Sequence, residues 1–370
     1  MTVDSELTEE LLATIPADIV EAMSPQMREV LSIQAARAEK CRAIGEEAAQ
    51  AADCQRPADC NGSAESDIPA DRDTLAKRAE YRAERSVWNE GGPIMARTDD
   101  RHIRAAGVNV PIRIHRPTAE AVLPGIVFLH GGGYSVGDLD THDRIMRVLA
   151  EAAGCAVIGV DYSLSPEATY PQALHECAAI IDHLARHGHE YGIDGTRLAV
   201  AGDSAGAGLT LGAALLLRDE PEVVAADPES FAALRALISI YGGHGLIDSA
   251  SRRLFGGDWD GMGANDLNNL MGEYFAEPDE AESPYVAHLT ADLSGLPPVF
   301  VVAAGLDPLR DDSRALARTL ERAGNDVEFE EYTHVLHSFL HFGRILDDTN
   351  TVLHNAAAFA SKLLDQRGQG

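Results

Sequence analysis

The chain has 370 residues and a hydrophobic content of 45%, enough for one large domain with a sizeable core plus an appended segment. Its formal net charge of −29 argues against nucleic acid or an anionic membrane as a partner. The cysteines are odd in number and lack paired metal spacing, so they predict neither a disulfide framework nor a zinc site.

Residues 1–100 are expected to form a helical N-terminal cap or extension. A short amphipathic helix is expected to begin near Thr8. Ser24 followed by Pro25 is a typical start for a second helix, which would run toward Cys54. The later part of this helix has a thin apolar face, so we expect it either to fray or to pack against a partner.

Residues 55–72 contain several turn-forming residues and are expected to form a flexible linker. A local bridge between Cys54 and Cys60 is conceivable there. A further helix is expected over 74–89. The first residues lack the charged and apolar regions of a signal peptide, so the expected location is cytoplasmic.

From residue 101 to 370 the pattern changes to strands that alternate with helices, which predicts a catalytic α/β domain. Strands are expected at 108–115, 124–130, 155–161, 197–201, 235–241, 298–304 and 326–332. Helices are expected at 143–153, 172–187, 207–218, 312–323 and 349–365. This alternation favours a mostly parallel, doubly wound sheet. Residues 242–284 have no strand pattern and are expected to be an insertion that completes the cap.

Residues Gly202-Asp203-Ser204-Ala205-Gly206 form a G-x-S-x-G pattern between an expected strand and an expected helix. A sharp turn at such a junction holds the serine in a strained conformation with its hydroxyl exposed. Glycine at both ends lets strand and helix approach without Cβ clashes. The pentapeptide alone also fits an ordinary small-residue turn, so Ser204 needs partners elsewhere in the chain.

A serine hydroxyl needs a base and an acidic group that orients this base. In doubly wound hydrolases the acid and then the histidine follow the serine in the chain. Asp307 directly follows the strand expected at 298–304 and is the preferred acid. Asp311 and Asp312 are rivals, but they lie at a helix start, where acidic side chains complement the helix dipole.

Three histidines follow the last expected strand, namely His334, His337 and His341. His337 is the preferred base because it lies on a loop that can reach the elbow, whereas His341 falls in a helical stretch and His334 in a solvated loop. Ser204 would be the nucleophile and His337 a general base and then a general acid. Asp307 would fix the tautomer of His337.

The glycine run after His130 predicts an oxyanion hole, because main-chain N–H groups there can turn toward one point. We expect the N–H groups of Gly131, Gly132 and Ala205 to be the donors, with His130 and Gly133 orienting the loop. A phosphate-binding loop is the competing interpretation, but the run lacks the G-K-[ST] ending and the G-x-G-x-x-G spacing. No metal site is expected.

These motifs together resemble the hormone-sensitive-lipase-like group of α/β-hydrolases, and within it the bacterial acetyl esterases. The motifs are 130–133, 202–206, 307–309 and 337–339, supported by 137–147, 161–167, 252–257 and 282–285. The similarity covers about residues 75–365, while residues 1–70 depart from it. It implies an α/β-hydrolase fold with a helical cap, hydrolysis of short acyl esters without a cofactor, and the catalytic residues Ser204, Asp307 and His337.

The predicted function is that of a serine carboxylesterase acting on small-molecule, acetyl-type esters through an acyl-enzyme. An amidase or thioesterase with the same triad is one alternative, and a ligand-binding module on a hydrolase scaffold is another. The N-terminal helices are a candidate arm for a homodimer. The acidic, lysine-poor composition fits either a salty environment or a GC-rich genome, and the sequence does not choose between them.

Overall fold

The computed structural model describes residues 11–55, 71–257 and 259–365. The helix start expected near Thr8, most of the expected linker and the conceivable Cys54–Cys60 bridge lie outside these residues. Among the described cysteines, Cys41, Cys155 and Cys177 are free thiols. None of the described helices is both long enough and apolar enough to cross a membrane.

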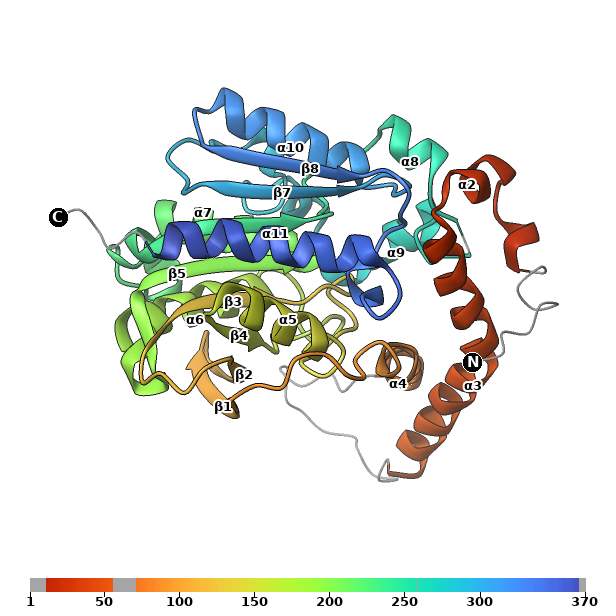
Figure 1. The fold of residues 1–370 in the computed structure, drawn as a ribbon, viewed down its shortest axis with the longest axis horizontal. Coiled ribbons are helices and arrows are strands. Elements are labelled where there is room, and N and C mark those ends of the chain that lie inside the picture. The colour runs from red at the N-terminus through yellow and green to blue at the C-terminus, as the bar shows by residue number, and fades with distance from the viewer. Residues whose placement is uncertain (1–10, 56–70, 258, 366–370) are drawn as a thin grey trace.

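One eight-stranded sheet forms the centre of the molecule, in the order β1-β2-β4-β3-β5-β6-β7-β8 (Figure 1). β1 pairs antiparallel with β2, and β2 pairs antiparallel with β4, whereas every later pairing is parallel. The strands are β1 (Arg97–Ala105), β2 (Val108–Arg116), β3 (Leu123–Leu129), β4 (Ala156–Val160), β5 (Ile193–Asp203), β6 (Leu234–Ile240), β7 (Val299–Ala304) and β8 (Val327–Tyr332).

Helices cover both faces of this sheet and bury two hydrophobic cores. The side chains of β3 alternate between them, since Ile126 and Phe128 join one core while Val127 and Leu129 join the other. Residues of α5 and α11 belong to the first core, and those of α6, α7 and α10 to the second. These helices are α5 (Asp143–Ala153), α6 (Gln172–His187), α7 (Ala205–Asp219), α10 (Arg310–Arg322) and α11 (Asp347–Leu364). The predicted doubly wound α/β fold is confirmed.

The seven expected strands and five expected helices of this region are present, and β1 is the strand that the sequence analysis missed. Its residues are mostly charged, and only Ile103 and Ala105 are buried. β1 lies at the edge of the sheet and pairs with β2 along its whole length. A polar edge strand of this kind resists pairing with other chains but lacks the apolar alternation on which sequence patterns depend.

The N-terminal helices are α2 (Ala17–Ala22), α3 (Pro25–Gln55) and α4 (Arg72–Ser86). The N–H of Met27 donates to Ser24 Oγ at 3.0 Å, so Ser24 is the N-cap predicted for α3. The later half of α3 does not fray within the described residues, because it packs against α4. A Cβ added at Gly45 would lie 2.8 Å from the carbonyl oxygen of Ala76, so glycine permits this close approach.

α2, α3 and α4 contact the loops that follow the carboxyl ends of the strands. The N–H of Ser24 donates to the carbonyl of His334, which lies after β8. Arg78 of α4 donates to the carbonyl of Ser135 after β3 and forms an ion pair with Glu167. The first described residues therefore cover the sheet edge at which the predicted catalytic residues lie.

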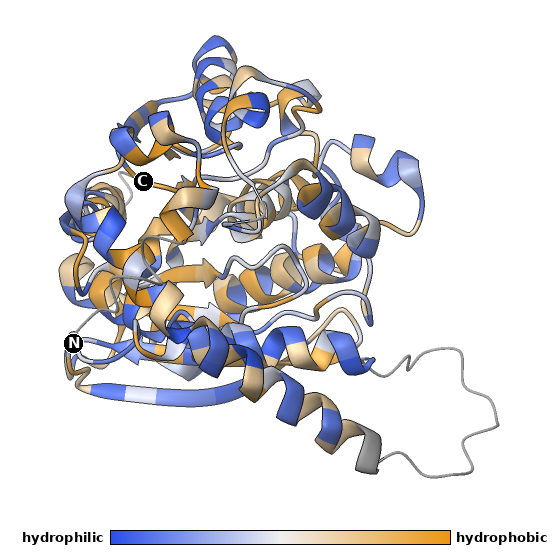
Figure 2. Cartoon of the chain, turned by 90° about the vertical axis from the view of Figure 1, so that its right-hand side faces the viewer, coloured by the Kyte–Doolittle hydropathy of each residue, from blue (hydrophilic) through white to orange (hydrophobic). Residues whose placement is uncertain are grey.

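Residues 242–284 contain no strand among those described, as expected, and include α8 (Ala250–Leu254) and α9 (Ala264–Tyr274). Tyr274 stacks on Tyr134 with ring centroids 3.7 Å apart. Figure 2 shows hydrophobic residues concentrated in the central strands and flanking helices, with more hydrophilic residues in the outer helices. The short 3-10 helices are η1 (Gly188–Tyr191), η2 (Pro221–Val224), η3 (Ser230–Ala233), η4 (Pro278–Glu282), η5 (His288–Thr290) and η6 (Phe339–Phe342).

Candidate active site

Ser204 lies between β5 and α7 in a strained backbone conformation, with φ 53° and ψ −117°. A non-glycine residue with positive φ is uncommon and is held there by its surroundings. A Cβ at Gly206 would collide with the carbonyl of Leu129, and one at Gly202 would collide with the carbonyl of Gly206. The strained strand-to-helix turn predicted from the pentapeptide is therefore present, and it needs both glycines.

The three side chains predicted as a catalytic triad lie in one hydrogen-bonded line. Ser204 Oγ is 2.8 Å from His337 Nε2, and His337 Nδ1 is 2.7 Å from Asp307 Oδ2. Asp307 is fully buried, and its Oδ1 accepts the N–H of Leu309 at 2.8 Å. Because the Nδ1–H group donates its hydrogen bond to the aspartate, the proton of the neutral ring stays on Nδ1 and Nε2 is left as an acceptor for the serine hydroxyl.

The pKa of His337 reflects two opposing effects. Burial lowers it, but the charge of Asp307 and the hydrogen bond to its carboxylate outweigh burial, so the pKa lies above the ordinary value. A base with a pKa near or above neutrality accepts a proton from serine more readily. The environment of His337 thus suits general-base chemistry.

The two rival histidines, His334 and His341, make contacts away from Ser204. His334 is exposed, and its Nδ1 donates to the carbonyl of Ala22 at 2.7 Å. His341 is buried and packs edge-on against His142, with ring centroids 4.5 Å apart. The structure therefore brings neither of them to Ser204.

The rival aspartates hold the 242–284 segment in place, a role that the sequence analysis did not foresee. Asp312 is fully buried and accepts the N–H groups of His244 and Leu246. Asp311 accepts the N–H of Ser251 at 2.9 Å. These carboxylates therefore do more than complement the dipole of α10, because they attach the loop after β6 to that helix.

Gly131 was expected to be an oxyanion donor, and the structure contradicts this. Its N–H donates to Asp203 Oδ1 at 2.8 Å, so it is not free to turn toward a substrate. The N–H groups of Gly132, Gly133 and Ala205 have no acceptor among the described residues. Gly132 and Gly133 have φ values of +124° and +58°, which turn the loop at this point. The donors that the geometry favours are therefore Gly132, Gly133 and Ala205.

Asp203 anchors this glycine loop from beneath. Its Oδ2 accepts the hydroxyl of Tyr241 at 3.2 Å, and His142 Nε2 lies 3.4 Å from its Oδ1. Burial raises the pKa of Asp203, but His142 and the N–H of Gly131 outweigh burial and leave the pKa below its usual range. A charged carboxylate is thus maintained under the loop.

His142, Asp203 and His341 also form the one group of three metal-type side chains found among the described residues. Their ligand atoms lie within 4.8 Å of one another. Both oxygens of Asp203 already accept hydrogen bonds from the glycine loop and from Tyr241. The donor set therefore fits a buried polar network that supports the loop.

His130 contacts the glycine loop from its other side. Its Nδ1 donates to the carbonyl of Gly131 at 2.9 Å, and its ring stacks on Tyr162 at 4.3 Å. Burial lowers the pKa of His130 to about 4, so the ring is neutral at physiological pH. These contacts agree with a residue that positions the loop rather than one that transfers protons.

A cavity of about 490 Å³ reaches His337. Its walls come from α3, α4, the 242–284 segment and the loops after β3 and β8, and they include Met27, Leu31, Tyr81, Val136, Trp259 and Phe342. The N-terminal residues that departed from the family resemblance therefore line the space beside the predicted base.

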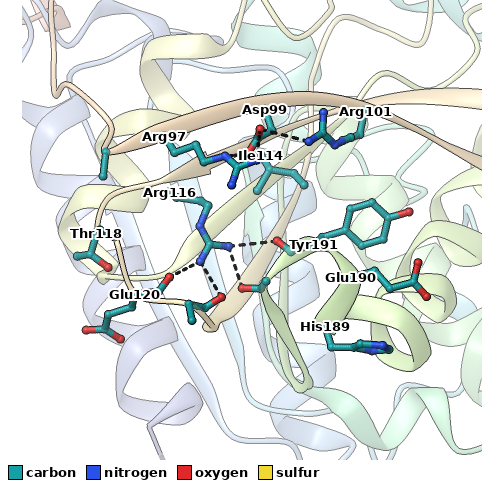
Figure 3. A pocket seen from close by; sticks show the side chains of 14 residues that line it. Arg97, Asp99, Arg101, Ile114, Arg116, Thr118, Glu120, His189, Glu190 and Tyr191 are labelled. Carbon is teal, nitrogen blue, oxygen red and sulfur yellow. Dashed lines mark hydrogen bonds and ion pairs between the residues drawn. The ribbon is translucent and has the colours of Figure 1, made fainter.

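A second cavity, of about 460 Å³, lies at the opposite edge of the sheet, where β3 and β5 begin (Figure 3). Arg116 lines it and donates to four main-chain carbonyls, those of Glu120, Ala121, Tyr191 and Gly192. Arg97 and Arg101 share the carboxylate of Asp99. These partners explain the arginines as links between neighbouring loops and strands.

Residues 126–341 match the Abhydrolase_3 family model, described as an alpha/beta hydrolase fold. The chain is 42% identical over 297 residues to the acetyl esterase of Salmonella schwarzengrund, covering 79% of this chain and 88% of that one. It is 41% identical to the acetyl esterase of Salmonella enteritidis over the same shares of the two chains.

Solved structures give the same result. A hyperthermophilic esterase from the archaeon Pyrobaculum calidifontis superposes with a TM-score of 0.74 at 30% identity, covering 78% of this chain and 93% of that one. The carboxylesterase EstE1, cloned from a metagenomic library, has a TM-score of 0.74 at 29% identity, with coverage of 79% and 98%.

Proposed function

Because this chain belongs to the Abhydrolase_3 family of α/β hydrolases, we propose that it is a serine carboxylesterase that cleaves short-chain acyl esters, acetyl esters first. The observation that carries this proposal is the line from Ser204 Oγ through His337 to Asp307, with separations of 2.8 and 2.7 Å. The similarity to acetyl esterases supports the choice of acyl group.

In the proposed mechanism Ser204 Oγ attacks the ester carbonyl while His337 Nε2 takes the hydroxyl proton. The tetrahedral intermediate collapses as the carbon–oxygen bond to the alcohol breaks, and His337 returns its proton to the departing alkoxide. Water then attacks the acyl-enzyme with His337 again as base, which releases the acid and restores Ser204. Asp307 stabilises the imidazolium that forms in each half-reaction.

The developing oxyanion would bind to the N–H groups of Gly132, Gly133 and Ala205. These groups project from a turn held by Asp203 and from the first residue of α7, where the helix dipole also favours negative charge. Donors fixed before the reaction stabilise the transition state without further reorganisation.

Replacing Ser204 with alanine tests the nucleophile. Ser204→Ala should lower the turnover of p-nitrophenyl acetate by at least about 10⁴-fold, because alanine has no hydroxyl to accept the acyl group. The matched control is Ser361→Ala, which removes the hydroxyl of a half-buried serine on α11, far along the chain from the loop of His337. Both variants should keep the circular dichroism and melting temperature of the parent, and near-normal turnover by Ser204→Ala would overturn the mechanism.

Labelling and matched substrates separate the alternative functions. A fluorophosphonate should label the parent at Ser204 and should not label the Ser204→Ala variant. A ligand-binding module without an activated serine would not be labelled in either form. Among ester, anilide and thioester substrates that carry the same acyl group, the ester should be cleaved fastest. Faster cleavage of the anilide would favour an amidase, and faster cleavage of the thioester would favour a thioesterase.

The division into a helical cap (residues 1–100 with 242–284) and a catalytic domain is part of this proposal. It is supported by the contacts of α2–α4 with the loops around Ser204 and His337. A homodimer built on the N-terminal helices is a further proposal, which sizing of the full chain against one lacking residues 1–70 would test. A cytoplasmic location is consistent with the free thiols of Cys41, Cys155 and Cys177.

A further inference from the structure

Three carboxylates line the cavity beside His337, and two of them have no ion pair among the described residues. Glu80 and Asp260 differ from Glu84 in their partners. Glu84 accepts hydrogen bonds from Gln34 and Trp88 and pairs with Arg85. Glu80 of α4 and Asp260 of the 242–284 segment have no ion pair among the described residues.

The carboxylate of Asp260 is fixed at one oxygen and unpartnered at the other. Its Oδ1 accepts the N–H groups of Gly257 at 2.9 Å and Met262 at 3.0 Å. Its Oδ2 is buried and has no hydrogen-bond partner among the described residues. Buried polar atoms in native proteins are nearly always partnered, so this orphaned oxygen, on a residue that lines the cavity, indicates a missing donor.

The basic side chains of the cavity do not fill this need. Lys77 lies 3.6 Å from Glu273, which is outside the cavity lining. Arg85 pairs with Glu84 and stacks against the rings of Tyr81 and Phe342. Nε and Nη1 of Arg85 have no hydrogen-bond acceptor among the described residues, so this side chain also offers donors. The lining nevertheless holds three carboxylates, those of Glu80, Glu84 and Asp260, against two cations, so negative charge predominates in the cavity.

We propose that Glu80 and Asp260 bind the alcohol part of the ester, and that the enzyme prefers acetates whose alcohol donates hydrogen bonds through hydroxyl groups. This inference rests on the proposed function, since the acetyl group carries no donor and the donor must therefore belong to the alcohol. A site built to accept a substrate hydroxyl rejects the analogue that lacks it, because its acceptors are left unpartnered. Burial raises the pKa of Asp260 to about 6, so its carboxylate is largely charged at pH 7.5.

Three small acetates test the preference. Glycerol 1-acetate offers hydroxyl donors, propyl acetate has the same carbon skeleton without them, and acetylcholine offers positive charge without a donor. The measured quantity is kcat/KM for each, taken as a ratio to propyl acetate at pH 7.5. We expect the parent to prefer glycerol 1-acetate by at least about tenfold.

Asp260→Asn is the decisive variant because its amide oxygen can still accept from Gly257 and Met262. Its amide nitrogen would replace the free Oδ2 and turn an acceptor into a donor. We expect the ratio of glycerol 1-acetate to propyl acetate to fall about tenfold. Glu80→Gln, on α4, should lower the same ratio and keeps the test available if Asp260→Asn fails to fold. The control is Glu46→Gln, which removes an exposed charge from α3 outside the cavity lining.

The outcomes are distinct. A ratio that is the same in the parent and in both cavity variants would overturn this inference while leaving the esterase proposal intact. A preference for acetylcholine over both other acetates that vanishes in the variants would also overturn it, in favour of attraction by charge alone. If the parent cleaves none of the three acetates, the proposed function itself fails.

Discussion

At the scale of single residues, His337 determines how the reaction should depend on pH. Only the neutral imidazole can take the proton of Ser204, so protonation of His337 removes the base. Asp307 raises the pKa of His337 against the opposing effect of burial. The acid side of the pH profile should therefore be set by a group that titrates above 6.5.

This predicts that kcat/KM for p-nitrophenyl acetate falls tenfold per pH unit as the pH drops below the raised pKa of His337. Asp307→Asn removes the charge that raises this pKa, so the midpoint of the acid limb should move to lower pH. The maximal rate should also fall by about 10³–10⁴-fold, because the imidazole loses the partner that fixes its tautomer. A profile that is flat to about pH 4 would contradict His337 as the base, and an unmoved midpoint in Asp307→Asn would contradict its electrostatic link to Asp307.

At the scale of elements, the glycine loop after β3 shows why a motif can be recognised while its donors are misassigned. The run of glycines indicates where an oxyanion hole would lie, but the choice among its N–H groups depends on Asp203. That residue lies 72 positions later, on the next strand of the sheet. No local pattern in the loop indicates that the N–H of Gly131 already donates a hydrogen bond to Asp203.

The anchoring role of Asp203 gives a prediction for this loop. Asp203→Ala should release the N–H of Gly131 and lower kcat by about 100-fold, because the neighbouring donors lose their fixed positions. Asp203→Asn, which can still accept from Gly131, should lose clearly less activity. Steady-state kinetics with p-nitrophenyl acetate would measure both, with thermal melts to show that the variants are folded. Equal losses in the two variants would mean that the charge of Asp203, and not its hydrogen bond, is what the loop needs.

Most elements of the catalytic region could be predicted from periodicity, because their buried faces repeat at the spacing of strands or helices. β1 could not, since seven of its nine residues remain outside the core. The roles of Asp311 and Asp312 could not either, because the N–H groups that donate to them belong to residues 60 and 68 positions earlier. The order Ser204, Asp307, His337 was predictable because chain order and strand ends are both visible in the sequence.

At the scale of the whole molecule, the net charge of −29 is the dominant electrostatic property. Like charges spread over one surface repel one another and favour the unfolded chain, in which they lie further apart. Dissolved salt shortens the range of this repulsion from about 30 Å at 0.01 M to about 3 Å at 1 M.

The melting temperature should therefore rise between 0.01 M and 1 M NaCl, and activity should be kept over that range. A neutral osmolyte at equal osmolality is the control, because it changes water activity without screening charge. Loss of both stability and activity in salt would rule out adaptation to a salty environment and leave genome composition as the explanation of the acidic surface.

The contacts between α3 and the last third of the chain have a consequence for biosynthesis. Gln26 donates to Asp347, 321 residues later, and Ser24 reaches the loop that carries His334. At roughly 5–20 residues per second, α3 leaves the ribosome on the order of 15–65 s before these partners are made. During that interval the apolar residues Met27, Val30 and Leu31 can pack only with early members of their core such as Trp88, because later members such as Phe339 have not yet been made. The cavity beside His337 is therefore completed only after translation has passed the base itself, so a chain truncated before His337 lacks both the base and the complete cavity.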